Sequence, residues 1–181
     1  MIQTHLDDTL LFIINILDRL KIPYVVIGGI AVSHWAEPRY TTDVDLTILI
    51  DEKGWGALKE ETSKTSSVWT MIQMPQDEKV PDLCRLMWNG ILIDLQISKT
   101  EHQNELIRRA SRVELKGQTV ALVSPEDLFV LKLLADRTRD ISDLEGLVVH
   151  QPNLDMAYIR KWCRFWEIEK RLDRFLLKNR R

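Results

Sequence analysis

The sequence is poor in cysteine and has no long apolar segment. Cys84 and Cys163 are the two cysteines among its 181 residues, and neither has Cys or His neighbours at the spacing of a zinc site. A disulfide framework is therefore excluded, and a reducing compartment is indicated. The longest apolar run, around residues 10–17, is too short to span a bilayer, and the N-terminus lacks the basic segment of a signal peptide. We expect a cytoplasmic protein with no membrane partner.

The chain also lacks internal repeats, low-complexity tracts and linkers rich in proline or glycine. Hydrophobic residues make up 45% and charged residues 29% of the sequence, which is ordinary for a globular domain that buries a core without structural metals. Strand patterns alternate with helical ones over residues 1–123, whereas residues 124–181 are typical of helices alone. The pattern predicts a mixed α/β (α+β) fold, with an α/β core over residues 1–123 and a helical part over residues 124–181.

Hydrophobic periodicity and turn residues give the expected elements. Helices are predicted over residues 4–20, 30–36, 53–64, 101–109, 125–135, 140–150, 153–166 and 168–178. Strands are predicted over residues 24–27, 44–50, 68–74, 83–88, 91–97, 112–115 and 119–122. Asn89-Gly90 favours a two-residue turn, so the strands on either side of it should form a hairpin.

Three aspartates stand in or beside apolar strands. Asp43 and Asp45 bracket Val44 at the start of one strand, and residues two apart in a strand point to the same face. Asp94 lies within a second apolar strand, Ile91–Ile97, and can approach the first two acids if the strands pair. Carboxylates packed together repel, and burying them unpaired is costly. A divalent cation removes that penalty, and magnesium prefers such oxygen ligands together with substrate phosphates.

Further residues around this acid pair suit a nucleotide. Gly28-Gly29 falls between a strand and a helix, where glycine lets the backbone approach a ligand and a helix N-terminus attracts phosphate. Arg39 and Thr41 precede the acid pair and offer a guanidinium and a hydroxyl to the phosphates. Lys132, on the later helix that begins after Ser124, is another candidate phosphate contact. A lone Gly-Gly or Asp-x-Asp is usually a turn or a pair of solvated acids, but their occurrence together favours a metal-dependent nucleotide site.

The combination resembles the nucleotidyltransferase superfamily that includes DNA polymerase beta. The residues that carry the resemblance are Gly28-Gly29, then Asp43-Val44-Asp45 after thirteen intervening residues, then Asp94. The resemblance implies a minimal nucleotidyltransferase core with an ATP-like NTP as substrate and two Mg²⁺ ions, or Mn²⁺, held by Asp43, Asp45 and Asp94. It also implies that Asp94 lies beside the attacking hydroxyl and that Lys132 reaches the triphosphate.

Within the superfamily the chain looks most like the standalone bacterial AbiEii-like nucleotidyltransferases, several of which are toxins of toxin–antitoxin pairs. This closer resemblance rests on residues 27–46 and on Ser124-Pro125-Glu126-Asp127 through Arg137, Asp140 and Asp143. It implies NMP transfer to a hydroxyl of tRNA or protein, and a cognate antitoxin as a possible partner. Gly29 replaces the serine that many members carry, so one side-chain phosphate contact is missing.

Two other functions remain open, a transferase that modifies a small molecule such as an aminoglycoside and a non-catalytic nucleotide-binding module. Charge is one discriminating feature. Nine Lys and Arg residues against three acids between residues 160 and 181 make the C-terminal segment +6, although the whole chain carries −2. Such a segment could guide RNA, but a solvated helix face with a basic terminus explains it slightly better.

Overall fold

The protein is described by a computed structural model that covers the backbone of residues 2–179 and the side chains of residues 5–179. Over this part of the chain it forms eight helices and seven strands. The chain divides into two compact units. The first comprises the described residues of Met1–Ile30 and Tyr40–Val123, and the second those of Ala31–Arg39 and Ser124–Arg181.

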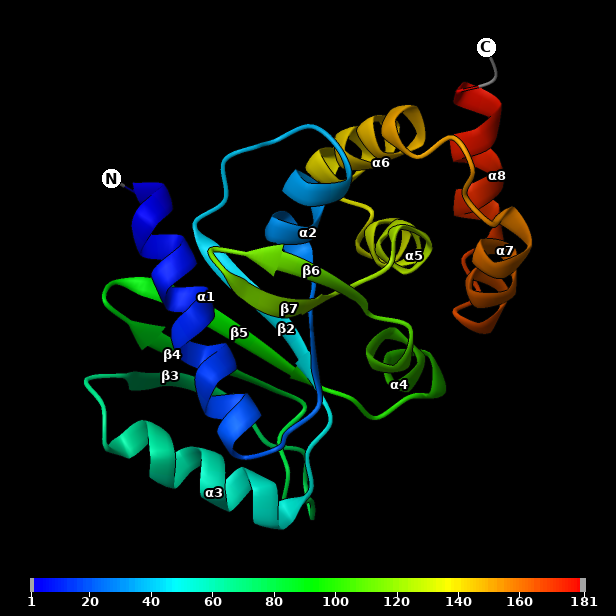
Figure 1. The fold of residues 1–181 in the computed structure, drawn as a ribbon. Helices are drawn as coiled ribbons and strands as arrows, with labels where there is room; N and C mark the ends of the chain where they lie inside the picture. The colour runs from blue at the N-terminus through cyan, green and yellow to red at the C-terminus, as the bar shows by residue number, and fades with distance from the viewer. Residues whose placement is uncertain (1, 180–181) are drawn as a thin grey trace. The chain divides into compact units, whose positions relative to one another are not determined.

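A mixed seven-stranded sheet forms the centre of the first unit (Figure 1). Its strands lie in the order β3-β4-β5-β2-β1-β7-β6. Two pairs, β2 with β5 and β1 with β7, are parallel, and the other neighbours are antiparallel. The strands are β1 (Tyr24–Val26), β2 (Asp43–Ile48), β3 (Val68–Gln73), β4 (Leu83–Trp88), β5 (Ile91–Ile97), β6 (Ser111–Leu115) and β7 (Gln118–Leu122). The predicted mixed α/β class is confirmed.

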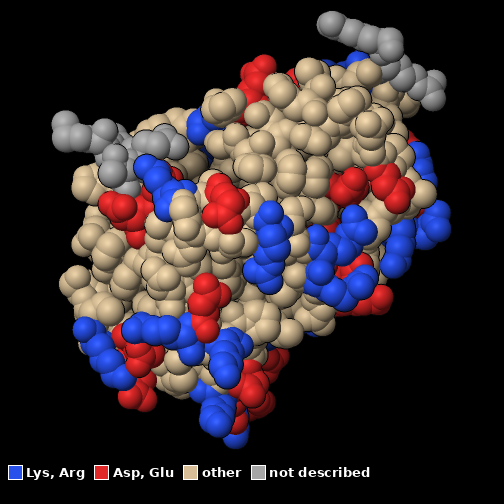
Figure 2. Space-filling view, viewed as in Figure 1, with Lys and Arg blue, Asp and Glu red and all other residues tan. Residues whose placement is uncertain are grey.

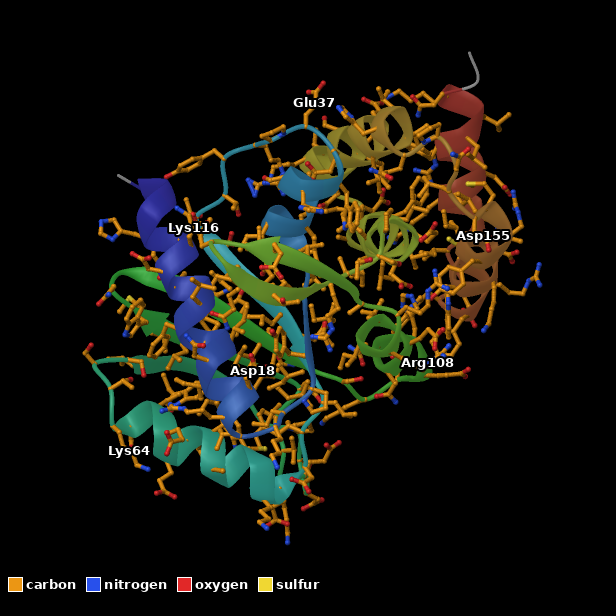
Figure 3. The ribbon with its side chains drawn as sticks, viewed as in Figure 1. Asp18, Glu37, Lys64, Arg108, Lys116 and Asp155 are labelled. Carbon is orange, nitrogen blue, oxygen red and sulfur yellow. The ribbon has the colours of Figure 1, made fainter. Side chains whose placement is uncertain are left out.

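Helices α1 (Ile2–Arg19) and α3 (Glu52–Ser63) pack on one face of this sheet (Figure 1). Phe12 of α1 stacks on Trp88 of β4, with ring centroids 4.2 Å apart, and Trp55 of α3 meets Trp69 of β3 edge to face. The apolar stripe of α1 is buried, as its spacing predicted. Thr100 caps helix α4 (Glu101–Arg108) through a capping box, and the helix carries Arg108 in its last turn (Figure 3), where a cation suits the helix dipole.

The second unit is helical. It contains α5 (Pro125–Ala135), α6 (Thr138–His150), α7 (Met156–Phe165) and α8 (Glu169–Lys178). Its core includes Phe129 and Phe175, whose rings meet edge to face, and the fully buried Trp162. Among residues 2–179 no helix combines the length and the apolar character that crossing a membrane requires.

The predicted elements agree with the structure to within two residues at each end, except at the start of α7. Helix α2 (Gly28–Trp35) begins on the glycines, which were expected to form a turn before it. Helix α6 begins at Thr138 because Asp140 accepts a hydrogen bond from the Arg137 backbone N–H. Helix α7 begins at Met156, after Asp155 caps it (Figure 3). Arg180 and Arg181 of the basic segment lie outside the described residues.

Candidate active site

Asp43 and Asp45 lie on the same face of β2. Strand β2 begins at Asp43, one residue earlier than the pattern predicted, so both acids belong to the ladder. Val44 and Leu46, which alternate with them, are fully buried on the opposite face. Both carboxylates are half-buried. The expected alternation therefore brings two acids together on one side of the sheet.

Asp94 is next to this pair because β2 and β5 are neighbours. The two strands run parallel, and their register places Asp45 directly opposite Asp94 and Asp43 opposite Leu92. Adjacent strands lie about 4.8 Å apart, and residues in register point to the same face. The three predicted acids thus share one face of two adjacent strands.

Arg85 of β4 is paired with Asp94, and the sequence reasoning missed it. Its Nε donates to Asp94 Oδ1 at 2.5 Å and its Nη2 to Oδ2 at 2.7 Å, which is the bidentate geometry of a strong ion pair. The hydrogen bonds to Asp94 raise the pKa of the Arg85 guanidinium, and the charges of Asp43 and Asp45 add to this. The signal was present in the sequence, because a two-residue turn at Asn89-Gly90 sets a register that puts Arg85 opposite Asp94.

The glycines at the start of α2 lie against the acids and the residues that hold them. Gly28 has φ +66°, and a Cβ atom built on it would come within 2.0 Å of Asp45 Oδ2. A Cβ on Gly29 would come within 2.4 Å of Thr41 Oγ1. The same Thr41 hydroxyl donates a 2.9 Å hydrogen bond to Asp43 Oδ1. Any side chain at either glycine would displace this arrangement, so the close approach explains both glycines.

The donor set at Asp43 and Asp45 fits a magnesium ion. Magnesium takes one or two carboxylates and completes its shell with water and substrate phosphates. Helix α2 starts at Gly28 beside these acids, and the positive end of a helix attracts anions. Over residues 5–179, however, no three His, Cys, Asp or Glu side chains are spaced to hold one metal ion together. Both oxygens of Asp94 are bonded to Arg85, so Asp94 could join a metal only by exchanging that partner.

Lys132 and Arg39 belong to the second unit and form an ion-pair network there. Lys132 is buried, and its Nζ lies 2.8 Å from Asp140 Oδ1 and 2.7 Å from Asp143 Oδ2. Arg39 contacts Asp143 through Nε at 2.8 Å and Nη2 at 3.1 Å. Buried charges need such partners. These contacts give both cations a structural role, and their predicted contact with phosphate stays a prediction.

A comparison with family models supports the predicted nucleotidyltransferase superfamily. A family model described as "Nucleotidyl transferase of unknown function (DUF2204)" matches residues 84–178, which include Asp94 and Lys132 but not Asp43 or Asp45. No curated protein matches the sequence. The AbiEii-like resemblance is not confirmed by these comparisons.

Several solved structures share the fold of this chain. An antigenic nucleotidyltransferase-like protein from Paracoccidioides brasiliensis aligns with a TM-score of 0.59 and 20% identity, over 96% of this chain and 88% of that one. ANT(2")-Ia in complex with adenylyl-2"-tobramycin aligns with 0.58 and 16%, over 86% and 94%. The lincomycin-bound lincosamide antibiotic adenylyltransferase LnuA aligns with 0.56 and 14%, over 76% and 93%. At these identities the likeness establishes the fold.

Proposed function

The chain belongs to the DUF2204 family of nucleotidyl transferases, and on that premise we propose that it moves a nucleoside monophosphate from an NTP to an acceptor hydroxyl. The acceptor oxygen attacks the α-phosphorus, the bond from the α-phosphorus to the bridging oxygen breaks, and pyrophosphate leaves. The observation that carries the proposal is the register of Asp43, Asp45 and Asp94 on one face of β2 and β5 beside the Gly28 turn.

Each residue of this site has a role in the proposed reaction. Asp43 and Asp45 would hold two magnesium ions, or manganese, with Asp94 as the third acid. Bound metal would neutralise the phosphates and stabilise the entering and leaving oxygens. Thr41 holds the Asp43 carboxylate in place through its hydrogen bond. Gly28 and Gly29 let the triphosphate approach the backbone, and Asp94 would accept a hydrogen bond from the attacking hydroxyl. Positioning of this kind accounts for much of the catalysis in phosphoryl transfer.

The acceptor is a separate part of the proposal. Modification of tRNA or protein by a toxin with a cognate antitoxin stays a prediction from the AbiEii-like resemblance. On the face shown in Figure 2, Lys and Arg side chains are interspersed with Asp and Glu, and no uniformly basic surface for RNA is visible there. A small-molecule acceptor is the second candidate. It is supported by the fold shared with ANT(2")-Ia, solved in complex with adenylyl-2"-tobramycin, and with the lincomycin-bound lincosamide antibiotic adenylyltransferase LnuA.

Label transfer tests the proposed reaction. The protein is incubated with magnesium and each of the four α-labelled NTPs, together with total RNA, lysate protein or a small-molecule extract. The variants are Asp45→Asn and, as the matched control, Asp77→Asn, which removes an exposed loop carboxylate. We expect label in one acceptor fraction, retained by Asp77→Asn and reduced at least a hundredfold by Asp45→Asn.

Other results would count against this proposal. Transfer that survives Asp45→Asn would mean that the acid pair does not carry the chemistry. Absence of transfer and of any NTP-dependent rise in thermal stability with magnesium would favour the non-catalytic module, because a ligand that binds the folded protein stabilises it. NTP binding without transfer to any fraction would leave the nucleotide site in place and reject the proposed acceptors.

A further inference from the structure

Two rows of residues cross the sheet from β3 to β2 on one face. Strand register defines both rows, because residues in register on neighbouring strands point to the same side. The first row is Met71, Arg85, Asp94 and Asp45. The second row is Val68, Met87, Leu92 and Asp43. Each row therefore begins with one apolar side chain on β3 and ends at one of the acids of the proposed active site.

This face is the one that α1 and α3 leave uncovered. The residues that alternate with the two rows on β3 and β4 include Trp69, which meets Trp55 of α3, and Trp88, which stacks on Phe12 of α1. Val68, Met71 and Met87 remain 54%, 37% and 37% exposed. Large apolar side chains that cluster in solvent mark a binding surface more often than single ones do. We call Val68, Met71, Met87 and Leu92 the apolar platform.

The platform has the dimensions of a small molecule. Strand spacing of about 4.8 Å puts Leu92 next to Asp43, Met87 about 10 Å from it, and Met71 about 14 Å from Asp45. A molecule with one or two rings on the platform would therefore bring a hydroxyl to Asp94. Methionine suits such a surface because its flexible thioether adapts to different apolar shapes.

The charges in the two rows disfavour a polyanionic acceptor. They contain three carboxylates and one cation, Arg85, whose guanidinium is committed to Asp94. Proteins that bind nucleic acid use Lys and Arg to contact the phosphates, and these rows supply no further cation. A neutral or cationic acceptor avoids repulsion from the carboxylates.

We propose that the apolar platform binds the acceptor, and that this acceptor is a neutral or cationic small molecule that presents a hydroxyl next to an apolar ring or chain. The proposal rests on the proposed function, since it places the acceptor beside the same acids. The acceptor oxygen forms the new bond to the α-phosphorus as pyrophosphate leaves, and the hydroxyl proton is released to solvent.

Methyl NMR tests the binding surface directly. Protein labelled with ¹³C-methyl methionine is titrated with benzyl alcohol and, separately, with a single-stranded RNA octamer, each with and without magnesium and a non-hydrolysable NTP analogue. We expect benzyl alcohol to shift the Met71 and Met87 signals and to leave Met156, on α7, unchanged. Met87→Glu should weaken this binding at least fivefold. The matched control is Met74→Glu, because Met74 is 44% exposed and lies outside both rows.

Label transfer to fractionated cell extract tests the acceptor class. We expect labelled product in the organic-extractable small-molecule fraction, reduced at least tenfold by Met87→Glu and unchanged by Met74→Glu. The proposal is overturned if Met71 and Met87 respond to the RNA octamer alone, if label enters RNA or protein, or if protein concentration shifts these signals because a second copy covers the platform. If the wild-type protein does not bind NTP, the proposed function is rejected instead. The two failures can be told apart, because the benzyl alcohol titration without nucleotide does not depend on NTP binding.

Discussion

Gly28→Ala is expected to destabilise the first unit by about 2–5 kcal/mol. Two effects contribute. Gly28 has φ +66°, and a left-handed conformation costs a residue with a Cβ about 1–2 kcal/mol. The new Cβ would also come within 2.0 Å of Asp45 Oδ2 and 2.8 Å of Asp45 Cβ. Because the Asp45 Cβ is fixed to the strand, side-chain rotation cannot relieve the clash, and overpacking of this kind costs about 1–3 kcal/mol.

Three other glycines of the same unit separate the two effects. Gly90→Ala has the backbone effect alone, since φ is +79° and nothing lies within 4 Å of the added Cβ, so we expect a loss of about 1–2 kcal/mol. Gly29→Ala has the clash alone, against Thr41, and should cost about 1–3 kcal/mol. Gly56→Ala, inside α3 with open space around it, should stabilise by about 0.5–1 kcal/mol.

Equilibrium urea unfolding, followed by circular dichroism, measures all four variants on one scale. Gly28→Ala should be the least stable and should also lose nucleotidyl transfer, because the clash displaces the Asp45 carboxylate. A Gly28→Ala protein that is no less stable than Gly90→Ala would refute this explanation. In that case the glycine would serve only the backbone conformation, and the close approach to Asp45 would have no energetic consequence.

Three further experiments test other parts of the structure. Lys132→Met leaves Asp140 and Asp143 without their shared cation and should lower the free energy of unfolding in urea by about 3–5 kcal/mol. The control, Lys178→Met, removes an exposed ion pair with Glu145 and should lower it by under about 1 kcal/mol. Equal losses would contradict a stabilising role for the buried ion-pair network. Thr41→Val removes the hydrogen bond to Asp43 and should weaken magnesium-dependent NTP binding about five- to tenfold in titration calorimetry, and unchanged affinity would mean that the bond does not position Asp43. Burial, with the Asp94 charge, raises the pKa of the Cys84 thiol to about 12, so iodoacetamide at pH 8 should label it much more slowly in the folded protein than in urea, as mass spectrometry can measure. Because the pKa of Cys84 is higher in the folded state than in the unfolded state, keeping this thiol protonated contributes to the stability of the fold. That contribution is complete below the usual pKa of a thiol and is lost as the pH rises toward 12. Rapid labelling of the folded protein would contradict the burial of Cys84.

The helices and strands were predicted well because residues close together in the sequence determine where each of them begins and ends. Ser124 and Pro125 define the start of α5, and the Asn89-Gly90 turn defines the β4–β5 hairpin with both strands as predicted. The alternation around Val44 correctly put Asp43 and Asp45 on one face. Each of these features depends on residues within a few positions of one another, so the sequence pattern is sufficient to predict it.

Long-range pairing was harder to predict. The sequence allowed Asp94 to approach the acid pair only if its strand was next to β2, and nothing local specified the parallel β2–β5 neighbours. Lys132 was predicted to contact phosphate, but its ion pairs with Asp140 and Asp143 depend on the packing of α5 against α6. Arg85 was overlooked because a single cation in an apolar strand has no meaning until the register of the hairpin is applied to it.

The hairpin that joins β4 and β5 also bears on the order in which the chain assembles. A two-residue turn closes on the microsecond timescale, whereas β2 must pair with β5 across the whole of α3, β3 and β4, at a larger entropic cost of loop closure. We therefore expect Arg85 to form its ion pair with Asp94 early, before β2 pairs with β5 and places Asp45 opposite Asp94. Asp43 and Asp45 would then approach an Asp94 carboxylate whose charge Arg85 already neutralises. Electrostatic repulsion between the acids would therefore oppose the pairing of β2 with β5 less strongly.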